Sequence, residues 1–174
     1  MKRTGHTKDT ENIGLLEDLQ TEFKSDVKKL SEETIVEAVV ALANTEGGTL
    51  YIGVEDDGTI TGVHKTHQST AGLSAMIFNR TVPNVSVSTD IMYSFAKPII
   101  SITVPKSYEL IYTSSGRALQ RRLKGDGTPE NYPMFLRDIR RYMVNAYGLD
   151  VSAYPVLDAT FDDLSLLEFE RMRS

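Results

Sequence analysis

The sequence contains no cysteine, so neither a disulfide framework nor a zinc site with thiolate ligands can form. The lack of cysteine fits a reducing compartment, and we expect a cytoplasmic protein. No run of about 18 apolar residues occurs, so no segment is expected to span a membrane. Residues Met1 to Glu11 are polar and charged, lack the apolar stretch of a signal peptide and are interpreted as a flexible lead-in.

Common catalytic signatures are missing as well. No Gly-x-x-x-x-Gly-Lys-Ser/Thr loop occurs, so this segment has no standard P-loop site for ATP. No Ser-His-Asp set is evident. His64 and His67 have no third metal ligand at a suitable local spacing, and we interpret them as turn residues.

The charge is distributed unevenly along a chain of 174 residues with a net charge of -5. From Lys97 to Lys124 there are six basic residues and one acid, whereas Asp158 to Glu170 holds five acids and no base. A local basic stretch can bind phosphate even on an acidic protein, because exposed charges are screened beyond about 8 to 10 Å. The alternative is a solvated basic edge without a ligand.

Hydrophobic periodicity predicts one α+β domain with a mixed, mostly antiparallel sheet and two to three packed helices. Ser31 is expected to cap a helix that ends near Asn44. The other expected elements are strands at 19–23, 50–54 with a return at 60–63, 85–91, 100–104 and within 110–122, helices at 67–80 and 134–146, and a loop at 124–133. Two facing apolar patterns predict one core that contains Val39, Leu42, Leu50, Ile52 and Val54.

An ordered set of motifs lies between Glu17 and Val63. It consists of Glu22-Phe23-Lys24, then Ala41-Leu42-Ala43-Asn44-Thr45-Glu46-Gly47-Gly48, then Thr49-Leu50-Tyr51-Ile52-Gly53-Val54-Glu55-Asp56-Asp57-Gly58, and finally Ile60-Thr61-Gly62-Val63. This combination resembles the Schlafen AlbA-like domain, whose bacterial members are described as DNA-binding transcriptional regulators. Family members often carry a Tyr-x-Arg-x-Gly type segment in the later strands, where this chain has Tyr112-Thr113-Ser114-Ser115-Gly116-Arg117.

The resemblance implies a domain organisation. We expect a flexible segment at 1–12, a Schlafen AlbA-like domain at 13–150, and an acidic tail or the start of a further domain at 151–174. Residues 159–164 resemble the segment that follows this domain in longer relatives, which continue into an ATPase-like region and a winged helix. The chain therefore looks like the N-terminal part of a longer regulator, or a shortened relative of one.

Three carboxylates form the sharpest candidate site, and their roles are implied by the resemblance. In some animal Schlafen proteins, carboxylates in the pattern of Glu17, Glu22 and Asp56 belong to a metal-dependent RNA cleavage site. Such a cluster holds Mg²⁺ or Mn²⁺, and Lys24 would neutralise charge on the phosphoryl group. Five residues of extended strand cover about 16 Å, so Glu17 reaches Glu22 only if the chain bends. The alternative is that Glu22 pairs with Lys24 or a neighbouring base and that Asp56 serves its turn.

Two further groups are candidates for nucleic-acid contact. Arginine binds phosphate in a forked geometry and tyrosine offers a stacking face for bases. The first group of candidates therefore consists of Lys106, Tyr108, Tyr112, Arg117, Arg121, Arg122 and Lys124. Arg137, Arg140 and Arg141 of the predicted third helix could extend this group. The second group is Asn44, Gly47 and Gly48, where a glycine backbone permits close approach of a phosphate or a nucleotide edge. A tight helix-to-strand turn is the alternative interpretation of this second group.

Three functions follow from these residues. The first is a nucleic-acid-binding domain of a transcriptional regulator that contacts mainly the phosphate backbone of DNA or RNA. The second is a divalent-metal-dependent endoribonuclease that uses the three carboxylates. The third is an interaction domain whose sheet edge forms a homodimer.

Overall fold

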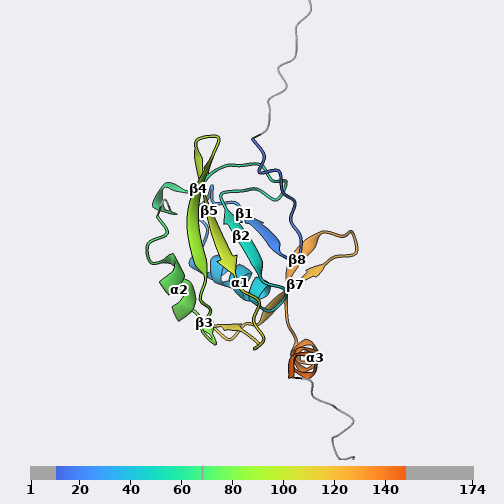
Figure 1. Cartoon of the computed structure of the whole chain (residues 1–174). Coiled ribbons are helices and arrows are strands. Elements are labelled where there is room, and N and C mark those ends of the chain that lie inside the picture. The colour runs from blue at the N-terminus through green and yellow to red at the C-terminus, as the bar shows by residue number, and fades with distance from the viewer. Residues whose placement is uncertain (1–10, 68, 148–174) are drawn as a thin grey trace, which may run out of the picture.

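The computed structural model describes residues 11–67 and 69–147. Its main sheet has four strands in the order β1-β2-β5-β4 (Figure 1). The strands are β1, Thr21–Lys24, β2, Gly48–Ile52, β4, Ser88–Ser94, and β5, Lys97–Val104. β1 and β2 are parallel, whereas β2–β5 and β4–β5 are antiparallel. The mixed sheet with three α-helices confirms the predicted α+β class.

Helix α1, Glu32–Ala43, covers one face of this sheet. It begins as predicted, because the Ser31 side chain accepts a hydrogen bond from the Thr34 N–H at 3.1 Å and Glu32 and Glu33 occupy the first turn, at the positive end of the helix dipole. Eight of its residues are buried. They pack on Leu50 and Ile52 of β2 and on the inward residues of β5.

The core prediction was correct for burial but wrong in one assignment. Val39, Leu42, Leu50, Ile52 and Val54 are all at most 1% exposed, yet Val54 belongs to a second cluster with Phe23, Ile60 and Ile99. The cause is Gly53, whose φ of 96° ends β2 and turns the chain before Val54. Phe23 and Val54 thus pack apart from the cluster that contains α1.

Two predicted elements differ from the structure. The helix expected over 67–80 is a 3₁₀ turn, Lys65–His67, followed by a short helix α2, Leu73–Asn79, because Gly72 has left-handed backbone immediately before α2. The expected return strand at 60–63 is reduced to a single bridge between Val54 and Ile60. The short strands β3, Thr81–Val82, and β6, Tyr112–Thr113, pair antiparallel.

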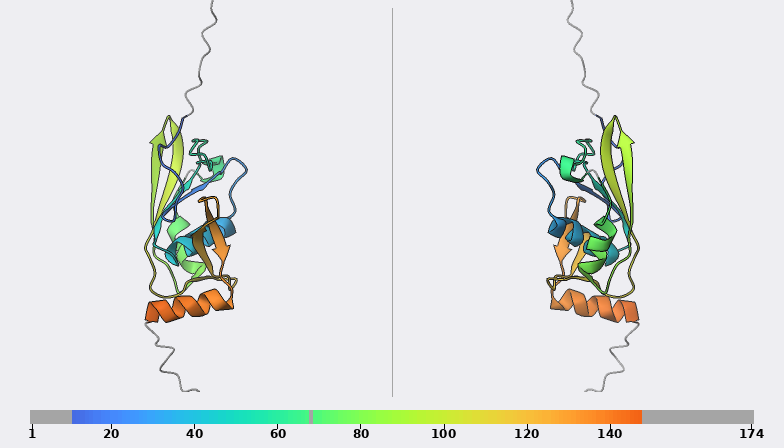
Figure 2. Two further views of the ribbon diagram at one scale, coloured as in Figure 1. Left: turned by 90° about the vertical axis from the view of Figure 1, so that its right-hand side faces the viewer. Right: turned by 90° about the vertical axis from the view of Figure 1, so that its left-hand side faces the viewer.

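A second antiparallel hairpin lies partly where a loop was expected. Its first strand falls mostly within the region 110–122, where strands were predicted, and its second strand falls within the expected loop at 124–133. It joins β7, Leu119–Leu123, to β8, Pro129–Pro133, with the glycine-rich turn between them. The two prolines occupy the ends of β8, where they leave the central pairs intact. Figure 2 shows α1 and this hairpin on the same side of the β4–β5 strands.

Helix α3, Leu136–Tyr147, lies at the opposite end of the molecule from the β4–β5 turn (Figure 2). It is held by a small third cluster of Leu110, Ala118 and Met134, onto which Ile139 and Tyr142 pack. Phe135, before the helix, and Met143 of α3 are exposed. The predicted segment 151–174 lies outside the described residues.

Candidate nucleic-acid interface

A buried group of charges joins β1 to the β7–β8 hairpin. The Glu22 carboxylate, in a residue that is 3% exposed, forms ion pairs with both Lys24 and Arg121. It also accepts a hydrogen bond from the Asn131 side-chain amide at 3.0 Å. Glu22 and Lys24 lie two residues apart on one face of β1, so the alternation of the strand itself brings this pair together.

Arg121 is enclosed by the same group. Its Nη2 donates to the carbonyl oxygens of Asp18 at 2.6 Å and Thr21 at 3.0 Å, and its Nη1 donates to the Asn131 side chain at 3.0 Å. Burial lowers the pKa of the Arg121 guanidinium, and the negative charges of Glu17 and Asp18 oppose this shift. The Arg121 side chain is 0% exposed, so the expectation that it forms part of an exposed basic stripe is wrong.

The chain bends between Glu17 and Glu22, as convergence of the carboxylates requires. The Asp18 N–H donates to the Thr21 carbonyl at 3.1 Å, which closes a turn. Beyond this turn, the side-chain carboxylate of Glu17 accepts the Phe23 N–H at 2.6 Å. Burial lowers the pKa of Lys24, and the nearby carboxylates of Glu17 and Asp56 oppose this shift. The three predicted carboxylates, Glu17, Glu22 and Asp56, therefore all interact electrostatically with Lys24.

This arrangement does not fit a shared metal ion. Within residues 11–67 and 69–147, no three His, Cys, Asp or Glu side chains are grouped so that they could hold one metal. Glu17 faces a backbone N–H and Glu22 faces two cations, so both carboxylates already have partners that a metal would have to displace. The geometry agrees with the alternative in which Glu22 pairs with Lys24 and a neighbouring base.

Asn44, Gly47 and Gly48 make close contacts with the protein itself. The Asn44 amide donates to the carbonyls of Ile111 and Leu119 at 2.8 and 2.9 Å, and its oxygen accepts the Ile111 N–H at 2.8 Å. A Cβ on Gly48 would lie 2.0 Å from the Gln20 carbonyl oxygen, and one on Gly47 would lie 2.6 Å from the Lys106 nitrogen. The close approach is thus between backbone segments of this chain.

The two faces of the β7–β8 hairpin differ in exposure. Arg121 and Asn131 are register partners and point toward Glu22. The neighbouring positions alternate to the other face, where the Arg122 guanidinium lies 3.4 Å from the centre of the Tyr132 ring and its Nε donates to Glu130 at 2.6 Å. The Arg122 side chain is 47% exposed, and Lys124 follows on the same face as an exposed residue.

The other predicted contact residues are separate from this face. Arg117 pairs with Glu37 of α1, and Lys106 donates to Glu46 at 2.9 Å. Tyr112 is half-buried against the third cluster. Arg137, Arg140 and Arg141 are exposed on α3.

Sequence reasoning missed Tyr132. It lies in the stretch 124–133, which was interpreted as a loop because of its glycines and prolines. Residues 129–133, Pro-Glu-Asn-Tyr-Pro, show no alternation of apolar and polar side chains, so no periodic signal indicated a strand at this position.

Comparison with known proteins identifies the family. A family model described as Schlafen, AlbA_2 matches residues 17–128, and the chain belongs to that family. This confirms the resemblance, and the family indicates a nucleic-acid-associated domain. No curated protein matches the chain.

A solved structure shows the same fold. The chain is similar to the DIP2311 protein from Corynebacterium diphtheriae, with a TM-score of 0.58 and 23% identity over 89% of this chain. The match covers 32% of DIP2311, so the chain spans about a third of that protein. The N-terminal domain of an ATP-dependent DNA helicase RecG-related protein from Nitrosomonas europaea aligns with a TM-score of 0.44 and 20% identity, over 56% of this chain and 71% of that domain.

Of the helices in the described parts of the chain, none has the length and apolar character that a membrane span needs.

Proposed function

We propose that this chain is the nucleic-acid-binding domain of a transcriptional regulator, and that the outer face of the β7–β8 hairpin contacts the phosphate backbone of DNA or RNA. The observation that carries this proposal is Arg122 stacked at 3.4 Å over Tyr132 on an exposed hairpin. The regulatory role rests on the family resemblance.

The geometry suits backbone contact. Stacking fixes the plane of the Arg122 guanidinium while its outer N–H groups stay available, which favours forked contact with a phosphate. Lys124, which directly follows β7 and whose N–H still donates to the Thr128 carbonyl at 2.8 Å, adds a second cation on the same face. Buried Arg121 anchors the hairpin to β1, so the exposed cations are presented from a fixed support.

The test is fluorescence anisotropy with a labelled duplex and a labelled single strand at two salt concentrations. Binding should weaken as salt rises, and the double change Arg122→Glu and Lys124→Glu should reduce the slope of log K against log salt by about two. A charge-matched control changes Lys28 and Lys65, both exposed residues outside the hairpin, to Glu. Equal loss in the two double variants would remove the hairpin from the interface.

An endoribonuclease is a second candidate, favoured by one observation: the carboxylates of Glu17 and Asp56 both act on Lys24, beside Glu22. The site in its present arrangement does not fit a metal ion, so we derive no catalytic step through one. Cleavage of a structured RNA is measured with Mg²⁺, with Mn²⁺ and with EDTA. RNA that is bound but not cleaved with either metal would exclude this candidate and leave the binding function in place.

The homodimer also stays a prediction. β1 and β4 are the outer strands of the main sheet. Light scattering of the protein without nucleic acid gives its mass directly, and a monomeric mass would contradict a dimer through either edge.

A further inference from the structure

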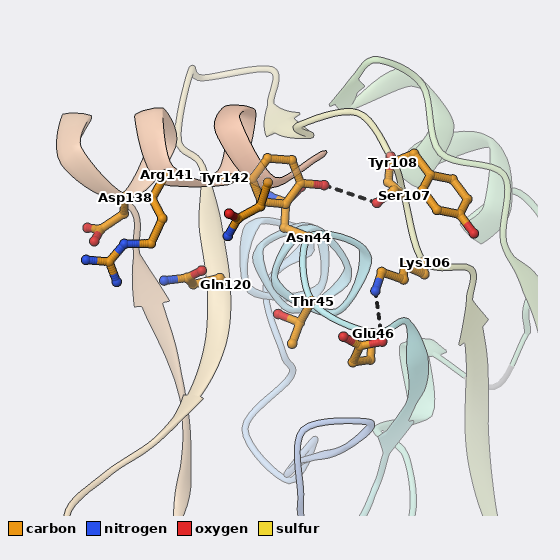
Figure 3. Close-up of a pocket in the computed structure, with 11 residues that line it drawn as sticks. Asn44, Thr45, Glu46, Lys106, Ser107, Tyr108, Gln120, Asp138, Arg141 and Tyr142 are labelled. Atoms are coloured by element: carbon orange, nitrogen blue, oxygen red, sulfur yellow. Dashed lines mark hydrogen bonds and ion pairs between the residues drawn. The ribbon is translucent and has the colours of Figure 1, made fainter. Parts of the chain in front are cut away.

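A cleft opens between α3 and the body of the domain. Its volume is about 590 Å³, which is within the range of small-ligand sites and larger than a bare phosphate requires. Figure 3 shows Arg141 of α3 pointing toward Gln120 of β7, with Lys106 on the other side of the cleft. The segment around Asn44 and Thr45, at the end of α1, lies between them.

The acidic groups of this cleft already have partners. Glu46 accepts a hydrogen bond from Lys106 at 2.9 Å, and this hydrogen bond raises the pKa of Lys106. Asp138 accepts the Phe135 N–H at 3.0 Å at the start of α3 and pairs with Arg137 at 3.5 Å. These carboxylates are therefore occupied within the protein.

The donors facing the cleft are different. Among the residues that the structure describes, no group pairs with the Arg141 guanidinium or with the side-chain amide of Gln120. Asn145 adds a second amide from α3. Tyr108 lines the rim, and its side chain is mostly exposed.

This set of groups fits one class of ligand. The Arg141 guanidinium suits a phosphate, with Lys106, which is already paired with Glu46, as a further cation on the opposite wall. A carboxamide offers one acceptor and two donors, the pattern that reads the edge of a base. An exposed tyrosine ring at the rim provides a stacking surface. A simple anion would use only the cations, whereas a nucleotide uses the cations, the amides and the ring.

The cleft also continues the hairpin face described above. Gln120 and Arg122 share one side of β7, and Lys124 continues this alternation directly after the strand. Gln120 is the register partner of Tyr132. A single strand that follows Lys124 and Arg122 along this face arrives at Gln120. Its next unstacked nucleotide then lies at the mouth of the cleft.

We propose that the cleft lined by Lys106, Gln120, Arg141 and Asn145 binds one unstacked nucleotide. As a site for a nucleotide within a strand, it rests on the proposed function and would make this domain prefer single strands to duplexes. A free nucleotide has the same chemistry, and the experiment separates the two sources.

The first measurement compares Arg141→Glu with Arg140→Glu. Both residues are exposed on α3 and both changes alter the charge equally, but only Arg141 lines the cleft. Anisotropy with a labelled single strand should show about tenfold weaker binding for Arg141→Glu, since hydrogen bonds to a charged group are lost, and less than about threefold for Arg140→Glu. Binding of a blunt duplex should change equally in the two variants.

The second measurement uses AMP and UMP as free-nucleotide probes. Their addition should shift the side-chain amide NMR signals of Gln120 and Asn145 in the wild type, and not in Arg141→Glu. The same titration is made with Tyr108→Ala, which removes the exposed ring at the rim and should reduce the shifts, and with Tyr93→Ala, a similarly exposed tyrosine of β4 that should leave them unchanged. Nucleotide shifts without strand binding would support the cleft and contradict the proposed function.

Strand binding that falls equally in Arg140→Glu and Arg141→Glu, with no amide shift, would overturn the cleft site. That result would leave the hairpin interface standing, because the interface is tested separately through Arg122 and Lys124.

Discussion

Two adjacent arginines on β7 show how one strand supports two different tasks. Arg121 is fully enclosed by Glu22, Asn131 and backbone carbonyls, whereas Arg122 is half-exposed over Tyr132. The two residues are the same in chemistry and adjacent in sequence, and only the alternation of the strand separates them. We infer that Arg121 contributes stability and that Arg122 contributes binding.

The largest expected effect is on stability, from Arg121→Ala. Removal of the guanidinium leaves Glu22 without its main partner and frees the Asp18 and Thr21 carbonyls. Loss of one partner of a buried pair typically costs about 3 to 5 kcal/mol, and we expect a loss of this order in the free energy of unfolding. Urea unfolding followed by circular dichroism measures it. A change below about 1 kcal/mol would show that Arg121 does not anchor the hairpin.

A somewhat smaller loss of stability is expected for Glu22→Gln. Glutamine keeps the shape and the hydrogen bond to Asn131 but removes the charge that pairs with Arg121, so we expect a cost of about 2 to 3 kcal/mol. Melting temperature and RNA cleavage are measured on the same preparations. If Glu22→Gln kept the wild-type stability but lost metal-dependent cleavage, the structural role of Glu22 would be contradicted and a catalytic role supported.

The third prediction concerns the exposed arginine. Arg122→Ala should change the free energy of unfolding by less than about 1 kcal/mol, as expected for exposed ion pairs, and should weaken nucleic-acid binding about fivefold to tenfold at low salt. Anisotropy and urea unfolding are performed together. If stability fell as much as in Arg121→Ala, the contrast between the two faces of the hairpin would be lost.

The smallest expected effect belongs to Tyr132→Phe. Phenylalanine keeps a ring beneath the Arg122 guanidinium, so binding should stay within about twofold of the wild type. Tyr132→Ala removes the ring and should approach the loss seen in Arg122→Ala. Equal, large losses in both variants would assign the role to the Tyr132 hydroxyl instead of the stacked ring.

The sequence allowed much of the fold to be predicted, because the signals concerned are local. The Ser31 cap and the alternation of 100–104 each involve residues close together in the chain. Strand β7 lies mostly within the region 110–122, where strands were predicted, but β8 was missed because Gly125, Gly127 and two prolines are typical of loops. The β7–β8 hairpin is stabilised by the hydrogen bond of Asn131 and the ion pair of Arg121 with Glu22, which lies about 100 residues away in the sequence.

The sequence indicated which residues are candidates for the site, but not which way their side chains point. The resemblance assigned Glu17, Glu22 and Asp56 to one candidate site, whereas the partners of Glu17 and Glu22 depend on a turn at Asp18 and on an arginine from a distant strand. Arg121 is buried and Arg122 is exposed because one face of β7 packs toward β1. The sequence alone does not show which of the two arginines lies on that face. The cleft was not predicted, since its walls come from α1, β7, the β5–β6 connection and α3.

Asn44 has a consequence for the order in which the domain opens. Its amide group binds Ile111 through both N–H and carbonyl, as a neighbouring strand would, and the same amide donates to Leu119 at the start of β7. The Ile111 N–H therefore becomes accessible to solvent only when the end of α1 separates from this connection. Its hydrogen exchange should follow the slow exchange of α1, and should not follow the faster exchange expected at the hairpin turn.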